Sequence, residues 1–157
     1  MCSLMCLQSE SAIVWSHLGK GTVHPDDLQI AWSSASMTSE SMARAFLVLD
    51  EVAALPQNWD TYGSPPIQRP ALDAARRLLH IGEAEGLPEP HIVPISGGGL
   101  QLEWYTPTHG LELMIHASGE FEYVLVNRPE DVVAEGDLPS VDEQRAQEYM
   151  RWFMHAH

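Results

Sequence analysis

Two glutamates in the strand-rich half of the chain have the types and the spacing to do chemistry together. The runs GLQLEWY and GLELMIHA are separated by Thr106–His109, a connection short enough for a hairpin. If that hairpin pairs Tyr105 with Gly110, Glu103 lies directly opposite Glu112. Like charges in such positions are destabilising, so we expect an arginine from elsewhere, a raised pKa or a basic partner to compensate them.

The same face of the predicted sheet combines acids with apolar side chains. Alternation with a period of two places every second residue of each run on this face. The residues that we predict to bind a partner there are Glu103, Tyr105, Glu112, Met114 and Glu122. An acidic and partly apolar surface is typical of a recognition site, although the segment Ser11–Leu18 could instead cover it.

A second cluster lies in the loop Leu55–Pro66, LPQNWDTYGSPP. Gly63 can adopt a positive φ, and Asp60 can bond its own backbone as turn residues do. We expect Trp59 and Tyr62 to reach inward, because each ring buries a large area and needs a partner for its N–H or O–H. We therefore interpret Trp59, Asp60, Tyr62 and Gly63 as a structural clasp between two helices and a sheet. In the alternative, Asp60 and Tyr62 form a catalytic or binding pair.

The motifs of common enzyme and metal sites are missing from the sequence. The chain has no Walker loop, no G-x-S-x-G and no H-E-x-x-H. The glycines at 97–99 lie between two predicted strands, which makes them a poor phosphate cradle. His91, His109 and His116 could converge on the sheet, but ordinary surface positions are the favoured interpretation. We predict no cofactor and no metal site.

The charge balance narrows the class of partner. The 157 residues include 22 Asp and Glu against 8 Lys and Arg, which gives a net charge of −14. Such a surface repels nucleic-acid phosphate and steers the protein toward basic partners. We therefore expect a basic protein partner and no direct binding of nucleic acid.

The cysteines and the N-terminal sequence predict a cytoplasmic protein. Cys2 and Cys6 are the only cysteines, too few for a disulfide framework. The stretch MCSLMCLQSE has neither a basic region nor a long apolar run, so we expect no signal peptide. No stretch approaches the roughly 20 apolar residues that cross a bilayer, so we expect no membrane association.

A predicted antiparallel sheet positions these side chains. Four β-rich runs between His91 and Asn127 are joined by short connections, which favours a four-stranded meander. Pro94 cannot donate to a ladder, so the first strand should be an edge. Alternation assigns to the core face Val93, Ile95, Leu100, Leu102, Trp104, Leu111, Leu113, Ile115, Phe121, Tyr123 and Leu125.

Two amphipathic helices are predicted before the sheet. The first carries an apolar stripe over residues 42–52 with steps of three and four. The second begins near Pro70 and ends at Gly82 or Gly86. Both stripes should face the core side of the sheet.

A last helix is predicted over Val141–His157, where Ser140 and Glu143 make a capping box. The segment before it, Arg128–Pro139, is interpreted as a polar, acid-rich connection. The predicted fold is therefore α+β, a four-stranded antiparallel meander with helices packed on one face and a C-terminal helix. It forms a single domain over residues 39–157, after an N-terminal segment, 1–38, of uncertain structure.

Two motifs together resemble a known family. The stretches NWDTYGSPP (Asn58–Pro66) and VPISGGGLQLEW (Val93–Trp104) are similar to a recurrent family of small uncharacterised bacterial proteins. Its usual pattern is N-W-D-x-Y-G-[AS]-x-P followed by G-G-x-Q-L-E-W. The resemblance covers roughly Leu55–Asn127. It implies a bacterial or phage-type source and no particular chemistry.

Two classes of function remain open. The first is a non-catalytic acidic protein-binding module, such as an antitoxin, an immunity protein or a phage-type inhibitor, that masks a basic surface. The second is a small hydrolase-like enzyme that uses Asp60, Glu103 and Glu112, with His116 as a further candidate. The first class explains the net charge with fewer assumptions.

Overall fold

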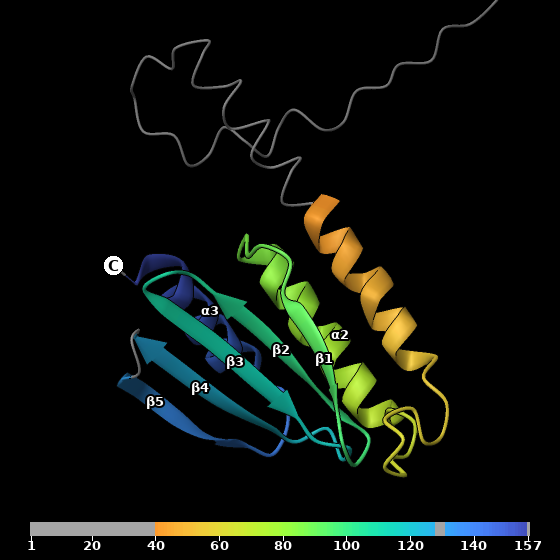
Figure 1. Ribbon diagram of the computed structural model, residues 1–157. Helices are drawn as coiled ribbons and strands as arrows, with labels where there is room; N and C mark the ends of the chain where they lie inside the picture. Colours follow the sequence, from red (N-terminus) through yellow and green to blue (C-terminus); the bar gives the residue numbers. More distant parts are fainter. Residues whose placement is uncertain (1–39, 128–130, 157) are drawn as a thin grey trace, which may run out of the picture. The chain divides into compact units, whose positions relative to one another are not determined.

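An antiparallel sheet with helices against one face forms the described part of the chain (Figure 1). The computed structural model describes residues 40–127 and 131–156. These residues all belong to one compact unit. The predictions for residues 1–38, including the one for Ser11–Leu18, lie outside the described residues.

The sheet is a meander in which each strand pairs with its neighbour in the chain. All four pairings are antiparallel. The α+β class and the antiparallel meander are confirmed, but the sheet has five strands rather than four. The strands are β1 (His91–Ile95), β2 (Gly99–Tyr105), β3 (His109–Ile115), β4 (Phe121–Asn127) and β5 (Asp131–Leu138).

β5 occupies most of Arg128–Pro139, the segment that the sequence predicts to be a polar connection. Its Asp, Glu, Gly and Ala residues are depleted in strands, so its local preference points away from β structure. In the fold it pairs along the whole of β4, from Phe121 opposite Leu138 to Asn127 opposite Asp131. Pairing with the neighbouring strand therefore overrides the local preference.

One assignment of faces is wrong in β1. Val93 lies opposite Gln101, an outer-face residue, so Val93 and Ile95 both point away from the core. Ile92 packs against the core in their place. Because β1 has apolar residues on both faces, alternation alone does not fix its register. Pro94 does lie in an edge strand, as predicted.

The described helices follow the predicted positions. One spans residues 40–53, α2 spans Arg69–Ala84 and α3 spans Glu143–His155. After α2, Gly86 takes a left-handed conformation with a φ of 77°. The Leu87 N–H then donates to the Gly82 carbonyl at 2.9 Å, which closes the helix end.

The N-terminus of α3 differs from the prediction by two residues. Asp142, rather than Ser140, is the N-cap, and its carboxylate accepts a 3.1 Å hydrogen bond from the Arg145 N–H. Aspartate and serine cap helices about equally well, so the sequence alone does not choose between them.

The core lies between the sheet and the helices. α2 and α3 pack on the same face of the sheet, and the helix at 40–53 runs beside α2 (Figure 1). Leu102, Leu113 and Leu125 all lie on this face and are buried, which confirms the predicted register of β2, β3 and β4. Each such leucine contributes roughly 1.5–3 kcal/mol when buried. Because the helices fill this face, a site on the sheet must use the other one.

Candidate functional site: the outer face of the sheet

All five predicted binding residues lie on the face of the sheet opposite the helices. The strand register places them there together with two acids of β5, Glu135 and Asp137. These two acids are not among the predicted residues, because the sequence predicts a polar connection where β5 forms. We call this surface the acidic face and define it by Val93, Gln101, Glu103, Tyr105, Glu112, Met114, Glu122, Val124, Val126, Val132, Glu135 and Asp137.

The centre of the acidic face is the predicted pair of glutamates. Tyr105 lies opposite Gly110, and Glu103 lies directly opposite Glu112, as the hairpin register requires. Both carboxylates are half-buried. Among the described residues, neither forms an ion pair with an arginine or a lysine.

Part of the expected compensation comes from neighbours on the same face. The Tyr105 hydroxyl donates to one oxygen of Glu112, and the Gln101 amide donates to the other at 3.2 Å. Glu103 instead has His91 opposite it on β1. Burial raises the pKa of Glu103, the charge of Glu112 raises it further, and His91 offsets part of the rise. Protonation of Glu103, which removes one of the two negative charges, is therefore easier than for an isolated glutamate.

A second pair of acids lies at the other end of the acidic face. Glu122 on β4 lies directly opposite Asp137 on β5. His116 Nε2 is 2.7 Å from a carboxylate oxygen of Glu122. A cavity of about 380 Å³ opens beside these three residues, with Phe121 and Leu138 also in its lining.

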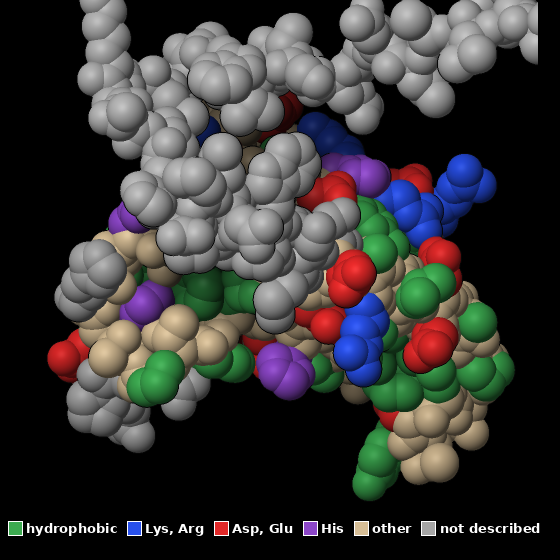
Figure 2. All heavy atoms as spheres, turned by 90° about the horizontal axis from the view of Figure 1, so that it is seen from above, with side chains coloured by type: hydrophobic (Ala, Val, Ile, Leu, Met, Phe, Trp, Pro, Cys, Tyr) green, Lys and Arg blue, Asp and Glu red, His purple; other side chains and the backbone are tan. Residues whose placement is uncertain are grey.

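Basic side chains are missing from the strands and present on the helices. The sequences of β1 to β5 contain no lysine and no arginine. Four arginines of the helices pair with acids in their neighbourhood: Arg44 with Glu89, Arg69 with Asp73, Arg76 with Asp50 and Arg151 with Glu85. Seen from above, basic and acidic side chains lie next to one another (Figure 2). The charge of the helical side is therefore mixed, whereas that of the acidic face is of one sign apart from histidine.

The loop between the helix at 40–53 and α2 is held by its own side chains. The Asn58 side chain accepts from the Gly63 N–H at 2.7 Å. The Asp60 carboxylate accepts from the N–H groups of Tyr62 and Ser64 and, at 2.6 Å, from the Ser64 hydroxyl. The Ser64 hydroxyl lowers the pKa of Asp60, the two N–H groups lower it further, and partial burial acts against them.

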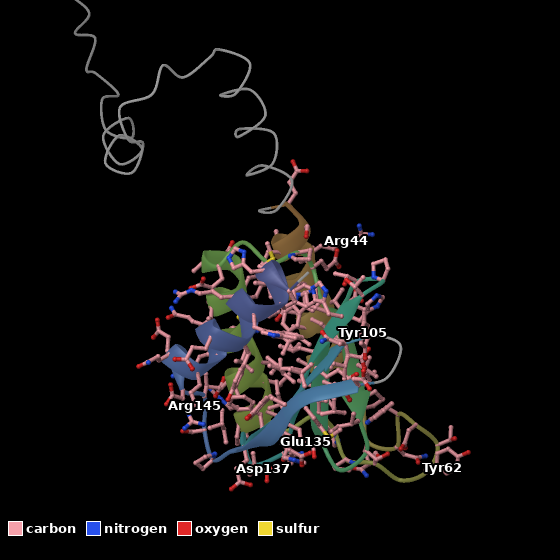
Figure 3. The ribbon with its side chains drawn as sticks, turned by 90° about the vertical axis from the view of Figure 1, so that its left-hand side faces the viewer. Arg44, Tyr62, Tyr105, Glu135, Asp137 and Arg145 are labelled. Carbon is pink, nitrogen blue, oxygen red and sulfur yellow. The ribbon has the colours of Figure 1, made fainter. Side chains whose placement is uncertain are left out.

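The predicted inward orientation of the two loop aromatics is wrong for Tyr62. This side chain is 92% exposed and points away from the rest of the fold (Figure 3). Trp59 is half-buried and donates its indole N–H to the Pro65 carbonyl at 3.3 Å, within the loop. Because Asn58 and Asp60 already satisfy the turn, the loop does not depend on aromatic anchors.

The loop is connected to the sheet by polar contacts. The Ser96 hydroxyl lies 3.4 Å from the Asp60 carboxylate, and the Gln68 N–H donates to the Gly98 carbonyl at 2.8 Å. Gly63 has a φ of 94°, which confirms its predicted positive φ. The clasp therefore joins the loop to the β1–β2 turn through hydrogen bonds rather than through buried rings.

The three histidines do not converge. His91 and His116 lie at the acidic face, beside Glu103 and Glu122, whereas His109 is buried between the sheet and α3. His109 Nε2 lies 2.7 Å from the Phe153 carbonyl, which can only accept. Nε2 therefore carries the proton, and Nδ1 accepts from the Thr108 hydroxyl at 2.9 Å. This is a satisfied core histidine.

The residues proposed for an enzyme lie at separate places. Asp60 contacts Ser96 in the β1–β2 turn, whereas Glu103 lies opposite His91, five residues before Ser96 and about 16 Å from it at the rise of a strand. His116 follows the end of β3 and is four residues from Glu112, about 13 Å along an extended chain. A cavity of about 580 Å³ near the end of α3 is lined by Tyr105 and His109 and by neither glutamate. Only Glu103 and Glu112 are brought together.

The part of the chain that the structure describes contains no group of three or more His, Cys, Asp or Glu side chains arranged to hold a metal ion. Each of its helices is too short or too polar to cross a lipid bilayer.

Comparison with known proteins returns no match to a family model, to a curated protein or to a solved structure. The resemblance to the family with the N-W-D-x-Y-G pattern therefore stays a prediction.

Proposed function

We propose that this protein is a non-catalytic binding module whose acidic face takes up a basic surface of a partner protein. An antitoxin, an immunity protein or a phage-type inhibitor that masks a nucleic-acid-binding surface acts in this way. The observation that carries the proposal is the pair Glu103 and Glu112, directly opposite each other on strands without a lysine or an arginine.

The electrostatics of this pair favour a cation from outside. Like charges directly opposite each other cost stability. Burial raises the pKa of Glu103, and the charge of Glu112 raises it further, so part of the rise reflects that cost. A lysine or arginine of a partner placed between the carboxylates would remove the repulsion and bring the pKa of Glu103 down again. Binding should therefore release protons in the pH range in which free Glu103 is partly protonated.

The apolar part of the acidic face supplies the other half of an interface. Val93 and Tyr105 are each 40% exposed and Val132 is 53% exposed, although all three lie on ordered strands. Tyrosine is enriched at interfaces, and apolar surface between charged groups gives affinity that salt does not screen. The acids should then control the association rate, and these side chains should control dissociation.

The experiment compares two sets of charge reversals with the same change in net charge. The test variant carries Glu103→Lys, Glu112→Lys and Glu122→Lys on the acidic face. The control carries Glu51→Lys, Glu83→Lys and Glu148→Lys on the helices, where the three acids are exposed. Association with a panel of synthetic basic peptides is measured by stopped-flow fluorescence at increasing salt, with acidic peptides as negative probes.

We expect the test variant to lose binding and the control to keep it. The association rate of the wild type should fall as salt rises, because exposed charges are screened beyond about 8 Å at physiological ionic strength. Circular dichroism checks that both variants remain folded. A test variant that binds as tightly as the wild type contradicts the proposal.

One observation favours the enzyme class. Glu103, with its raised pKa, lies beside Glu112, and such a pair of carboxyls can divide the roles of acid and base. A metal-dependent hydrolytic activity that Glu103→Gln abolishes, while binding of basic peptides persists, would support it. If the wild type has no hydrolytic activity and Glu103→Gln weakens the binding of basic peptides, the result supports the binding module.

A further inference from the structure

The outer edge of β5 is an open strand edge within the described chain. β5 is the last strand of the sheet and pairs only with β4. No described backbone group bonds to its other side, and no described helix or strand lies beyond it in Figure 1. The N–H and C=O groups on that side form a template for another extended chain.

The opposite edge of the sheet is less suited to pairing. β1 has five residues, and Pro94 in its middle has no N–H to donate. β5 has eight residues and no proline. Five of its eight residues are exposed, among them Val132 and Val133 at 53% and 48%. Of the two edges, β5 offers the longer ladder, with one register shift that leaves Val133 without a partner residue on β4.

The side chains of β5 decide what kind of chain can pair there. Asp131, Glu135 and Asp137 are its only charged residues, and all three are acidic and exposed. A second copy of this chain that paired through β5 would bring acids next to acids, which is unfavourable. The same positions favour lysine or arginine on an added strand. Glu135 and Asp137 belong to the acidic face, so an added strand would extend that face (Figure 3).

We propose that β5 receives an extended, basic segment of the partner as a sixth strand of the sheet. This proposal rests on the proposed function and specifies its partner. Backbone hydrogen bonds give the added strand affinity, and alternate side chains give it specificity. Its basic residues would lie on the acidic face beside Glu135 and Asp137. The intervening residues would lie on the core side beside Ala134 and Leu138, where apolar side chains fit.

The first arm of the test is hydrogen exchange of the free, full-length protein. Amides of β5 that face the edge should exchange rapidly at every protein concentration. Protection at all concentrations would show that the chain itself covers the edge. Protection that appears only at high concentration would show that a second copy does so. Either kind of protection overturns the proposal.

The second arm uses a synthetic peptide that alternates arginine and valine. Binding should protect the edge-facing amides of β5 from exchange. A peptide of the same sequence, N-methylated on the amides of one side, cannot complete the ladder. It should bind about tenfold more weakly or worse, because it loses several of the backbone hydrogen bonds that hold the added strand. N-methylation on the other side should have less effect.

Charge reversals separate failure of this inference from failure of the proposed function. Glu135→Lys with Asp137→Lys should weaken peptide binding at least as much as Glu103→Lys with Glu112→Lys. If N-methylation has no effect and only the second pair matters, strand addition is wrong and the proposed function stands. If neither the unmodified nor the N-methylated peptide binds at low salt, both strand addition and the proposed function are wrong.

Discussion

Glu103 on β2 lies directly opposite Glu112 on β3, and the neighbouring donors serve the two residues unequally. The Tyr105 hydroxyl and the Gln101 amide both donate to Glu112. Glu103 faces His91 on β1 instead, and burial together with the charge of Glu112 raises its pKa. Glu103 is therefore the residue of the pair that responds to pH and to an external cation.

The raised pKa of Glu103 predicts a fall of stability with rising pH. From about 4.5, its ordinary pKa, upward to the folded-state pKa, the folded protein holds a proton that the unfolded chain has lost. The free energy of unfolding therefore decreases through this window. Glu103→Gln removes the decrease, so its advantage over the wild type should grow across the window and then stay constant. The full difference in the free energy of unfolding between Glu103→Gln and the wild type should be about 0.2–1 kcal/mol, the range for a cross-strand charge pair.

Thermal unfolding midpoints at a series of pH values measure this difference. Glu51→Gln, on the exposed side of the helix at 40–53, is the control and should follow the wild type throughout. A constant offset between Glu103→Gln and the wild type at every pH would mean that Glu103 does not titrate differently in the folded state.

Two tryptophans should differ strongly in their contribution to stability. Trp104 is 2% exposed in the core, and its indole donates to the Pro88 carbonyl at 2.9 Å. Trp104→Ala should cost about 3–5 kcal/mol, as for other buried aromatics. Trp59 is half-buried in its loop, so Trp59→Ala should cost nearer 1 kcal/mol. Urea unfolding measures both, and equal costs would show that Trp59 is a core residue after all.

The register of the hairpin formed by β2 and β3 could be predicted, because the short connection between the strands and the alternation of apolar and polar residues together fix it. The Thr106–His109 connection left a single pairing that kept leucines on one face, and that pairing places Glu103 opposite Glu112. β5 gave no such signal, since its alternating residues are acids, glycine and alanine and only its contact with β4 makes it a strand. Two acids of the acidic face, Glu135 and Asp137, were missed with it.

The loop shows where sequence reasoning assigns the wrong cause. Trp59 and Tyr62 suggested aromatic anchors, since large rings are usually buried. Local hydrogen bonds are hard to weigh from sequence, and here the side chains of Asn58 and Asp60 satisfy the turn. Asn58 and Thr61 both have a left-handed backbone, with φ of 63° and 64°. Asparagine adopts this conformation fairly often, but a β-branched residue such as threonine rarely does, so the conformation of Thr61 could not be predicted from the sequence.

The Asp60 carboxylate should hold the loop in a pH-dependent way. Its pKa is lowered below 3.8, chiefly by the Ser64 hydroxyl, so the stabilisation is present above pH 3.8 and is lost as pH falls through the folded-state pKa. Asp60→Ala should speed hydrogen exchange of the Tyr62 and Ser64 amides at neutral pH. The Gly63 amide bonds to Asn58 instead and is an internal control. Unchanged exchange at Tyr62 and Ser64 would show that Asp60 does not organise the loop.

The last prediction concerns His109, which connects β3 to the end of α3. Its Nε2–H donates to the Phe153 carbonyl, and its Nδ1 accepts from the Thr108 hydroxyl. In the neutral imidazole the proton should therefore be on Nε2, and nitrogen chemical shifts report which nitrogen carries it. His109→Ala leaves the Phe153 carbonyl buried without its donor and should cost about 1–3 kcal/mol. His116→Ala, at a half-exposed position, should stay within about 0.5 kcal/mol of the wild type. An Nδ1–H tautomer, or equal costs for the two alanine variants in urea unfolding, would show that His109 does not anchor α3.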